Sequence, residues 1–145
     1  MRRCPWSCPP LAFGMGNRSG DWLRQAEADL RHARNARDDG DHEWACFAAQ
    51  QSAEKALKGL TQHLGGEPWG HAVTVLLGDL TERLDVPPPL VEAGKRLDKH
   101  YIPTRYPNGF DAGAPTDYYT AAEADAAIDD AARIMEFCRG QMGRS

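Results

Sequence analysis

The apolar residues of this chain recur with the period of an α-helix, and this pattern is the strongest constraint on its fold. In residues 21–38 four of them lie three or four positions apart, on one predicted helix face: Leu23, Ala26, Leu30 and Ala33. No segment alternates apolar and polar residues convincingly, as a half-buried β-strand would. We therefore predict an all-α fold.

Four further segments repeat this period and bring the predicted helices to five: residues 41–64, 71–84, 88–101 and 120–142. Thr120 begins the last segment and Glu123 follows three positions later, which is a capping box. Most connections are short, so we expect an up-and-down bundle. The exception is residues 102–119, a long proline-containing loop before the last helix, and loops of that length are often functional.

The segment 41–64 has two different faces. Small and apolar residues share one arc, which lets a second helix approach closely: Cys46, Ala49, Ala53, Ala56, Leu57, Leu60 and Leu64. A polar arc lies roughly opposite and carries Gln51, Glu54, Lys55, Lys58 and Gln62, with Trp44 and Phe47 at its head. We interpret this second arc either as a solvated stripe with an internal salt link or as part of a binding site.

Composition narrows the class of protein. The 145 residues suffice for one domain, and we assign residues 19–145 to it and residues 1–18 to a disordered N-terminal extension. The formal net charge of −4 argues against a protein that coats nucleic acid. No apolar run reaches the roughly 20 residues that span a bilayer, so we expect no membrane partner.

The four cysteines do not form the pattern of a disulfide framework. Cys46 and Cys138 fall on apolar helix faces. Cys4 and Cys8 lie in the N-terminal extension, without a second nearby pair that would complete a zinc site. We therefore expect a cytoplasmic protein that needs neither a metal nor a cofactor.

The stretch HYIPTRYPNG, residues 100–109, places Arg105 between Tyr101 and Tyr106 in a segment stiffened by two prolines. A guanidinium is a planar fork for a phosphate or carboxylate, and a phenol ring stacks on a base or sugar. The same arginine can instead bind carbonyl groups at a helix end and fasten the loop to the bundle. Both interpretations stay open, and they are compatible if the loop lines a cleft.

Two other groups are candidates for the same site. Lys55, Lys58 and Gln51 would form an anion-binding cluster if their helix face meets the proline-stiffened loop; otherwise they belong to a solvated stripe. His71 precedes a helical segment, where it is a cap, a dimer contact or, like His100, a candidate proton carrier.

Five stretches carry a resemblance to a known family: DWLRQAEADL, FAAQQSAEKALKGL, HAVTVLLGDL, LDKHYIPTRYPNG and YTAAEADAAIDDAARIM. In this order they resemble the HEPN (higher eukaryotes and prokaryotes nucleotide-binding) domain family over about residues 20–142. The most specific pieces are the Gln-Gln-x-x-Glu-Lys-x-x-Lys helix and the Tyr-x-x-x-Arg-Tyr-Pro loop. The resemblance implies a homodimeric helical bundle whose partner is a separately encoded minimal nucleotidyltransferase, often in toxin–antitoxin systems.

Some members of the family are metal-independent ribonucleases with an Arg followed, after four to six residues, by a His near the start of a late helix. This sequence departs from that pattern. No His follows Arg105, and three residues separate Arg96 from His100, although positions i and i+4 of a helix share a face. The literal match, Arg37 and His42, has three carboxylates between its members that would repel a phosphate.

Three functions are compatible with these observations. The first is a homodimeric binding subunit for a nucleotide or a nucleotidyltransferase, with Arg105 at the phosphate. The second is a metal-independent ribonuclease toxin acting on RNA, in which Arg105 or Arg96 holds the phosphate and His100 or His71 carries the proton. The third is a helical interaction scaffold without a ligand site.

Overall fold

The computed structural model describes residues 4–6 and 17–143 and confirms the predicted helical bundle. Every regular element in these ranges is a helix: α1 (Ser19–Asp38), α2 (His42–His63), α3 (Val73–Leu80), α4 (Pro88–Asp98), the 3-10 turn η1 (Pro107–Gly109), α5 (Pro115–Tyr118) and α6 (Ala121–Met142). The single turn α5 lies inside the predicted loop, so it is additional to the five predicted helices. None of the helices in the described ranges is long and apolar enough to cross a membrane.

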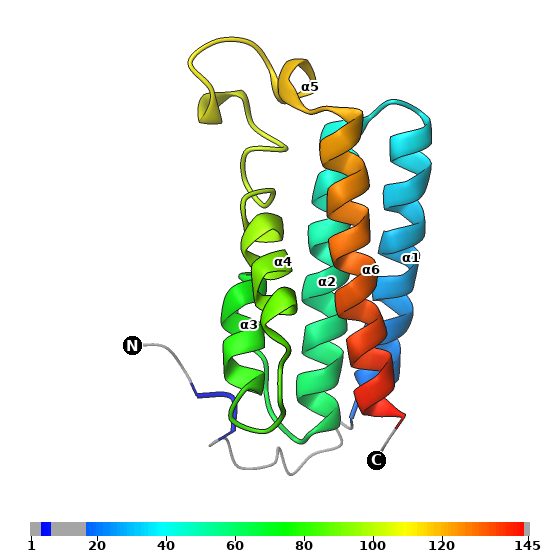
Figure 1. Cartoon of the computed structure of the whole chain (residues 1–145), viewed down its shortest axis with the longest axis vertical. Helices are drawn as coiled ribbons and strands as arrows, with labels where there is room; N and C mark the ends of the chain where they lie inside the picture. Colours follow the sequence, from blue (N-terminus) through cyan, green and yellow to red (C-terminus); the bar gives the residue numbers. More distant parts are fainter. Residues whose placement is uncertain (1–3, 7–16, 144–145) are drawn as a thin grey trace.

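Three long helices form the main layer of the molecule (Figure 1). α1 and α2 are antiparallel, and α6 lies beside them and runs in the direction of α2. Six of the seven residues on the predicted small-residue face are fully buried in the core: Cys46, Ala49, Ala53, Ala56, Leu57 and Leu60. The seventh, Leu64, follows the end of α2 and is partly buried. Gly59 marks how closely α1 approaches, because a Cβ there would lie 3.0 Å from the carbonyl oxygen of Ser19.

α3 and α4 form an antiparallel pair on one side of this layer (Figure 1). At the end of α4 the carboxylate of Asp98 accepts hydrogen bonds from the backbone N–H groups of Val73 (2.6 Å) and Thr74 (3.2 Å) and so caps α3. The periodicity predicted that this helix begins at His71. The tertiary cap explains why α3 begins at Val73 instead. Gly94 of α4 fits the same contact, since a Cβ there would lie 3.0 Å from the side chain of Leu77.

The start of α6 follows the predicted capping box. The backbone N–H of Glu123 donates to the hydroxyl of Thr120 (3.1 Å), and the backbone N–H of Thr120 donates to the Glu123 carboxylate (3.2 Å). The chain between α4 and α6 crosses one end of the bundle (Figure 1). It is ordered there partly by Phe110 and Tyr118, whose rings stack with centroids 4.2 Å apart. Arg105 of this loop lies over Phe47, near the N-terminal end of α2, where the candidate site is found.

Only residues 4–6 of the predicted N-terminal extension are described together with Asn17 and Arg18; residues 1–3 and 7–16, and with them Cys8, lie outside the described residues. The indole N–H of Trp6 donates to the carbonyl of Asp79 (3.0 Å), and the guanidinium of Arg83 lies 4.7 Å from its ring. This short piece therefore packs on α3.

Candidate functional site

The side chain of Arg105 lies among three aromatic rings. We call the four residues together the arginine cradle: Phe47, Tyr101, Arg105 and Tyr106. The guanidinium carbon is 4.4 Å from the centroid of the Phe47 ring, 4.8 Å from Tyr101 and 5.2 Å from Tyr106. Its Nε–H donates to the backbone carbonyl of Tyr101 (2.9 Å). The sequence predicted that these residues of the loop lie together. The ring from α2 completes the cradle.

The two terminal nitrogens of Arg105 have no hydrogen-bond or ion-pair partner among the described residues. One backbone carbonyl and three rings fix the plane of the guanidinium while leaving one edge of its fork for a ligand. A planar fork held in this way suits the two oxygens of a phosphate or carboxylate. Arg96 differs, because its Nε and Nη2 atoms bind both oxygens of Asp130 (2.8 and 2.9 Å).

His71 joins the arginine cradle through the ring of Tyr101. The two rings are stacked, with centroids 4.9 Å apart and planes 17° apart. The Nδ1 atom of His71 lies 3.3 Å from each carboxylate oxygen of Glu54. The first backbone N–H groups of α3 are bound by Asp98, so the cap that we considered for His71 is supplied by another residue. His71 keeps 58% of its side chain exposed and turns an oriented imidazole toward solvent.

Glu54 is a buried carboxylate that organises the polar arc of α2. Only 5% of its side chain is exposed, and it accepts from Lys58 (3.2 Å), Gln50 (3.4 Å) and Gln51 (3.4 Å) as well as facing His71. The amide of Gln50 also donates to the backbone carbonyl of His71 (3.0 Å), which ties the segment before α3 to α2. The predicted internal salt link is therefore present, but it is largely removed from solvent.

The two lysines of the predicted anion-binding cluster turn toward α1. Lys55 binds the carboxylate of Asp29 (2.6 Å), and only 24% of its side chain is exposed. Lys58, which is 13% exposed, binds Glu54 and lies 5.7 Å from the ring of Trp22. Each ammonium group is neutralised by a carboxylate, so neither lysine brings an uncompensated positive charge to Arg105.

His100 occupies a different environment from His71. Its ring meets Tyr119 edge-on, with centroids 5.7 Å apart, and its buried Nδ1 atom has no hydrogen-bond partner among the described residues. Burial lowers the pKa of His100 below its ordinary value, which favours the neutral imidazole. Arg96 is bound by Asp130, and the ring of His100 packs against Tyr119. Arg37 pairs with Asp38 and Asp125.

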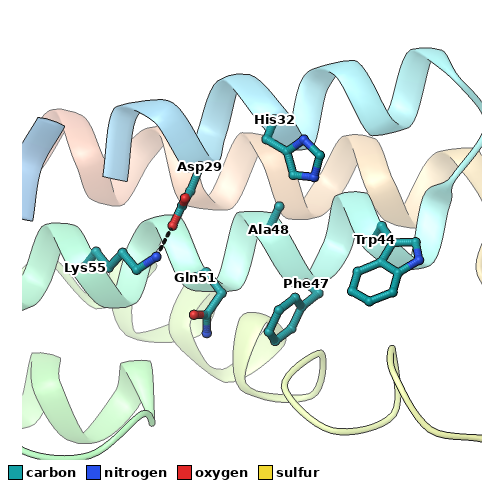
Figure 2. Close-up of a pocket in the computed structure, with 7 residues that line it drawn as sticks. All are labelled: Asp29, His32, Trp44, Phe47, Ala48, Gln51 and Lys55. Carbon is teal, nitrogen blue, oxygen red and sulfur yellow. Dashed lines mark hydrogen bonds and ion pairs between the residues drawn. The ribbon is translucent and has the colours of Figure 1, made fainter. Parts of the chain in front are cut away.

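A hollow of about 230 Å³ lies beside the cradle, between α1 and α2. Figure 2 shows the residues that line this α1–α2 hollow: Asp29 and His32 from α1, and Trp44, Phe47, Ala48, Gln51 and Lys55 from α2. Phe47 belongs both to this hollow and to the arginine cradle. Periodicity placed Trp44 and Phe47 at the head of the polar arc of residues 41–64. Two large aromatic residues on a polar helix face are the sequence signal for this hollow.

Comparisons with known proteins are consistent with this architecture. The sequence model of the HEPN domain family matches residues 19–141. TT1696 from Thermus thermophilus is 53% identical, with a TM-score of 0.84 over 86% of this chain and 98% of its own. ST0689, an archaeal HEPN homologue, is 44% identical, with a TM-score of 0.72 over 86% and 97% of the two chains. An HEPN domain protein from Thermotoga maritima, tm0613, is 33% identical, with a TM-score of 0.73 over 86% and 99%. No curated protein gives a significant match.

Proposed function

This chain belongs to the HEPN domain family, and we propose that it is a nucleotide-binding subunit that receives a phosphate at Arg105. It acts as a homodimer, and its physical partner is a separately encoded minimal nucleotidyltransferase in a two-gene system of the toxin–antitoxin type. The observation that carries the proposal is the guanidinium of Arg105, which three rings and one carbonyl orient and which no carboxylate of the described residues neutralises.

The first experiment measures phosphate binding by isothermal titration calorimetry, with pyrophosphate and a panel of nucleoside diphosphates as ligands. Arg105→Ala should weaken binding at least about tenfold, because a hydrogen bond to a charged group contributes roughly 1.5–3 kcal/mol. Arg105→Lys should lose most of the same affinity, since lysine keeps the charge but not the fork. Arg133→Ala is the matched control, because Arg133 lies exposed on α6 and pairs with Asp129 (2.9 Å). A panel without any binding would leave the helical scaffold as the better description.

The dimer and the partner need their own measurements. Large apolar side chains that are partly exposed offer area that a second chain would cover: Trp44, Trp69, Ile102, Tyr106 and Tyr118. Light scattering coupled to size-exclusion chromatography should give twice the mass of the chain. Co-expression with the nucleotidyltransferase encoded beside this gene should yield a complex that purifies through a tag on either chain. A monomer that passes through such a column alone would contradict this part of the proposal.

Metal-independent RNA cleavage is a second candidate function, and one observation favours it. His71 and Arg105 both lie against the ring of Tyr101, so a candidate proton carrier and a candidate phosphate-binding cation share one neighbour. Glu54 occupies Nδ1 of His71 and leaves Nε2 as the nitrogen that faces a substrate. The alternative pair, Arg96 and His100, is less favoured because each of these side chains is directed to another partner.

This candidate is tested by incubating the purified protein with RNA in the presence of a chelator. The wild type should cleave, His71→Ala and Arg105→Ala should not, and His100→Ala should cleave like the wild type because its ring contacts Tyr119. If the wild type does not cleave, or if His71→Ala cleaves at the same rate, RNA cleavage at this surface is excluded.

A further inference from the structure

The N-terminal segment places one large side chain, Trp6, against the helical domain. Residues 4–6 lie before residue 19, where the match to the HEPN family begins, so they are an addition to the family domain. In Figure 1 they lie beside α3, at the end of the bundle opposite the loop between α4 and α6. The contacts of this segment are therefore separate from the phosphate site proposed at Arg105.

The ring of Trp6 lies in a site formed by the α2–α3 connection and the end of α3. We call it the indole site: Gly66, Glu67, Asp79 and Arg83. The indole N–H donates to the carbonyl oxygen of Asp79 (3.0 Å), and the guanidinium carbon of Arg83 lies 4.7 Å from the ring centroid, in the range of a cation–π contact. The ring is partly buried and packs against the hydrophobic core. The site thus contacts both the polar edge and the face of an indole.

Gly66 shows how closely the indole site fits the ring. A Cβ at this position would lie 2.5 and 2.7 Å from two carbons of the Trp6 ring, far closer than the roughly 3.5–4.0 Å of a favourable carbon contact. Gly66 is not among the glycines with positive φ in the described residues, so its backbone does not itself require glycine. The missing side chain is therefore what gives the indole its space.

The residue before the tryptophan is held through its main chain. The carbonyl oxygen of Pro5 accepts from the backbone N–H of Glu67 (2.8 Å), and Pro5 is buried. Its ring fixes φ and leaves no N–H to satisfy, so little conformational freedom is lost when the segment docks. A main-chain hydrogen bond beside a pocket for one side chain is a common way to bind a short peptide. Pro5 and Trp6 together are the unit that this surface recognises.

We propose that the indole site is a peptide-binding site specific for a Pro-Trp segment, with the N-terminal segment of this chain as its built-in ligand. The contacts named above all go to residues between 66 and 83, and none needs the residues that join Trp6 to α1. The same peptide supplied in trans should make them equally. Tethering gives the built-in segment a millimolar effective concentration, so a partner protein that presents a Pro-Trp segment has to displace it.

The test titrates a synthetic peptide of residues 3–7 (RCPWS) into the full chain under reducing conditions and follows backbone amide signals by NMR. Trp6→Ala removes the built-in ligand, so this chain should bind the peptide, with shifts centred on Gly66 and Glu67. The wild type should bind it about tenfold more weakly, because its own segment competes. The Trp6→Phe peptide should bind about fivefold more weakly than RCPWS, since it has no N–H for the carbonyl of Asp79. The Trp6→Ala peptide should not bind.

Gly66→Ala, introduced into the Trp6→Ala chain, should abolish peptide binding. Gly78→Ala is the matched control, because the same change on α3 places a Cβ with no atom within 4 Å, and it should leave binding unchanged. In an otherwise wild-type chain, Gly66→Ala should release the indole, and the N–H signal of Trp6 should lose its protection from hydrogen exchange. This measurement does not depend on the folding of the Trp6→Ala chain.

Three results of the titration would overturn the proposal: no binding to the Trp6→Ala chain, equal binding to that chain and the wild type, and binding that survives Gly66→Ala. An indole N–H that stays equally protected in Gly66→Ala would overturn it as well. None of these results bears on phosphate binding at Arg105, because the arginine cradle takes no part in the indole site.

Discussion

Removal of the Glu54 carboxylate should destabilise the fold strongly, because this group is buried and has several partners. Glu54→Ala leaves the ammonium group of Lys58 without its carboxylate in an environment where only 13% of the lysine side chain is exposed. It also removes one of the two acceptors of the Gln50 amide, one of the two acceptors of the Gln51 amide, and the carboxylate that faces His71. Four groups thus lose a partner at once, and among them Gln50 is buried and Lys58 is largely buried.

The magnitude follows from the burial of this pair. Removing one member of a buried ion pair costs about 3–5 kcal/mol, and the remaining exposure of Lys58 argues for the lower end, about 3 kcal/mol. For a domain of this size that loss lowers the melting temperature by about 10 °C. Replacing both members, in Glu54→Ala with Lys58→Met, should be less harmful than the sum of the single changes, by about 1–3 kcal/mol.

The assay is chemical denaturation followed by circular dichroism, with Glu92→Ala as the control. Glu92 pairs with Lys95 on α4 while both side chains are 60% exposed, so its loss should cost less than about 0.5 kcal/mol. Added salt should reduce the control effect and leave the Glu54→Ala effect nearly unchanged, because buried pairs are screened less. Equal destabilisation by the two variants would refute the argument that Glu54 is desolvated and multiply bonded.

Three further predictions follow from local features. Thr120→Ala should lower the free energy of unfolding by about 1 kcal/mol in denaturation experiments, because it removes the capping box of α6. Burial lowers the pKa of His100 below its ordinary value of 6.5, so on acidification the unfolded chain binds a proton at this residue before the folded chain does. The folded state should therefore lose stability as the pH falls below 6.5. His100→Gln should show a smaller loss of melting temperature on acidification. Burial raises the pKa of Cys46 to about 12 and raises that of Cys138 further, so peptide mapping should find iodoacetamide on these two thiols only after denaturation.

The sequence predicted those parts of the fold that local signals determine. The capping box at Thr120 placed the start of α6, and the arc of small residues on α2 identified the face that α1 and α6 cover. The start of α3 could not be predicted in this way. Its cap comes from Asp98, which is near only after α4 has folded back along α3, and no pattern in the segment itself indicates a cap from so far along the chain.

The same distinction applies to the candidate site. Tyr101, Arg105 and Tyr106 are close in sequence, so their proximity could be predicted from the loop alone. Phe47 comes from α2, and it meets Arg105 only because the loop crosses the head of that helix. Periodicity also assigned Glu54 to a polar arc, yet this carboxylate is buried by the segment that carries His71. Periodicity gives the face of a helix, and the packing of other elements decides whether that face meets water.

The charge arrangement sets how a ligand can be held. Lys55 and Lys58 are compensated by carboxylates, so near the cradle the positive charge available to an anion is that of Arg105. A single guanidinium in a chain of net charge −4 provides little long-range attraction, and most of the affinity must then come from short-range contacts. Stacking on the rings around Arg105 and in the α1–α2 hollow is the contact that these residues offer. The phosphate binding proposed for Arg105 should therefore depend only weakly on salt, unlike the binding of a basic protein to a nucleic-acid backbone.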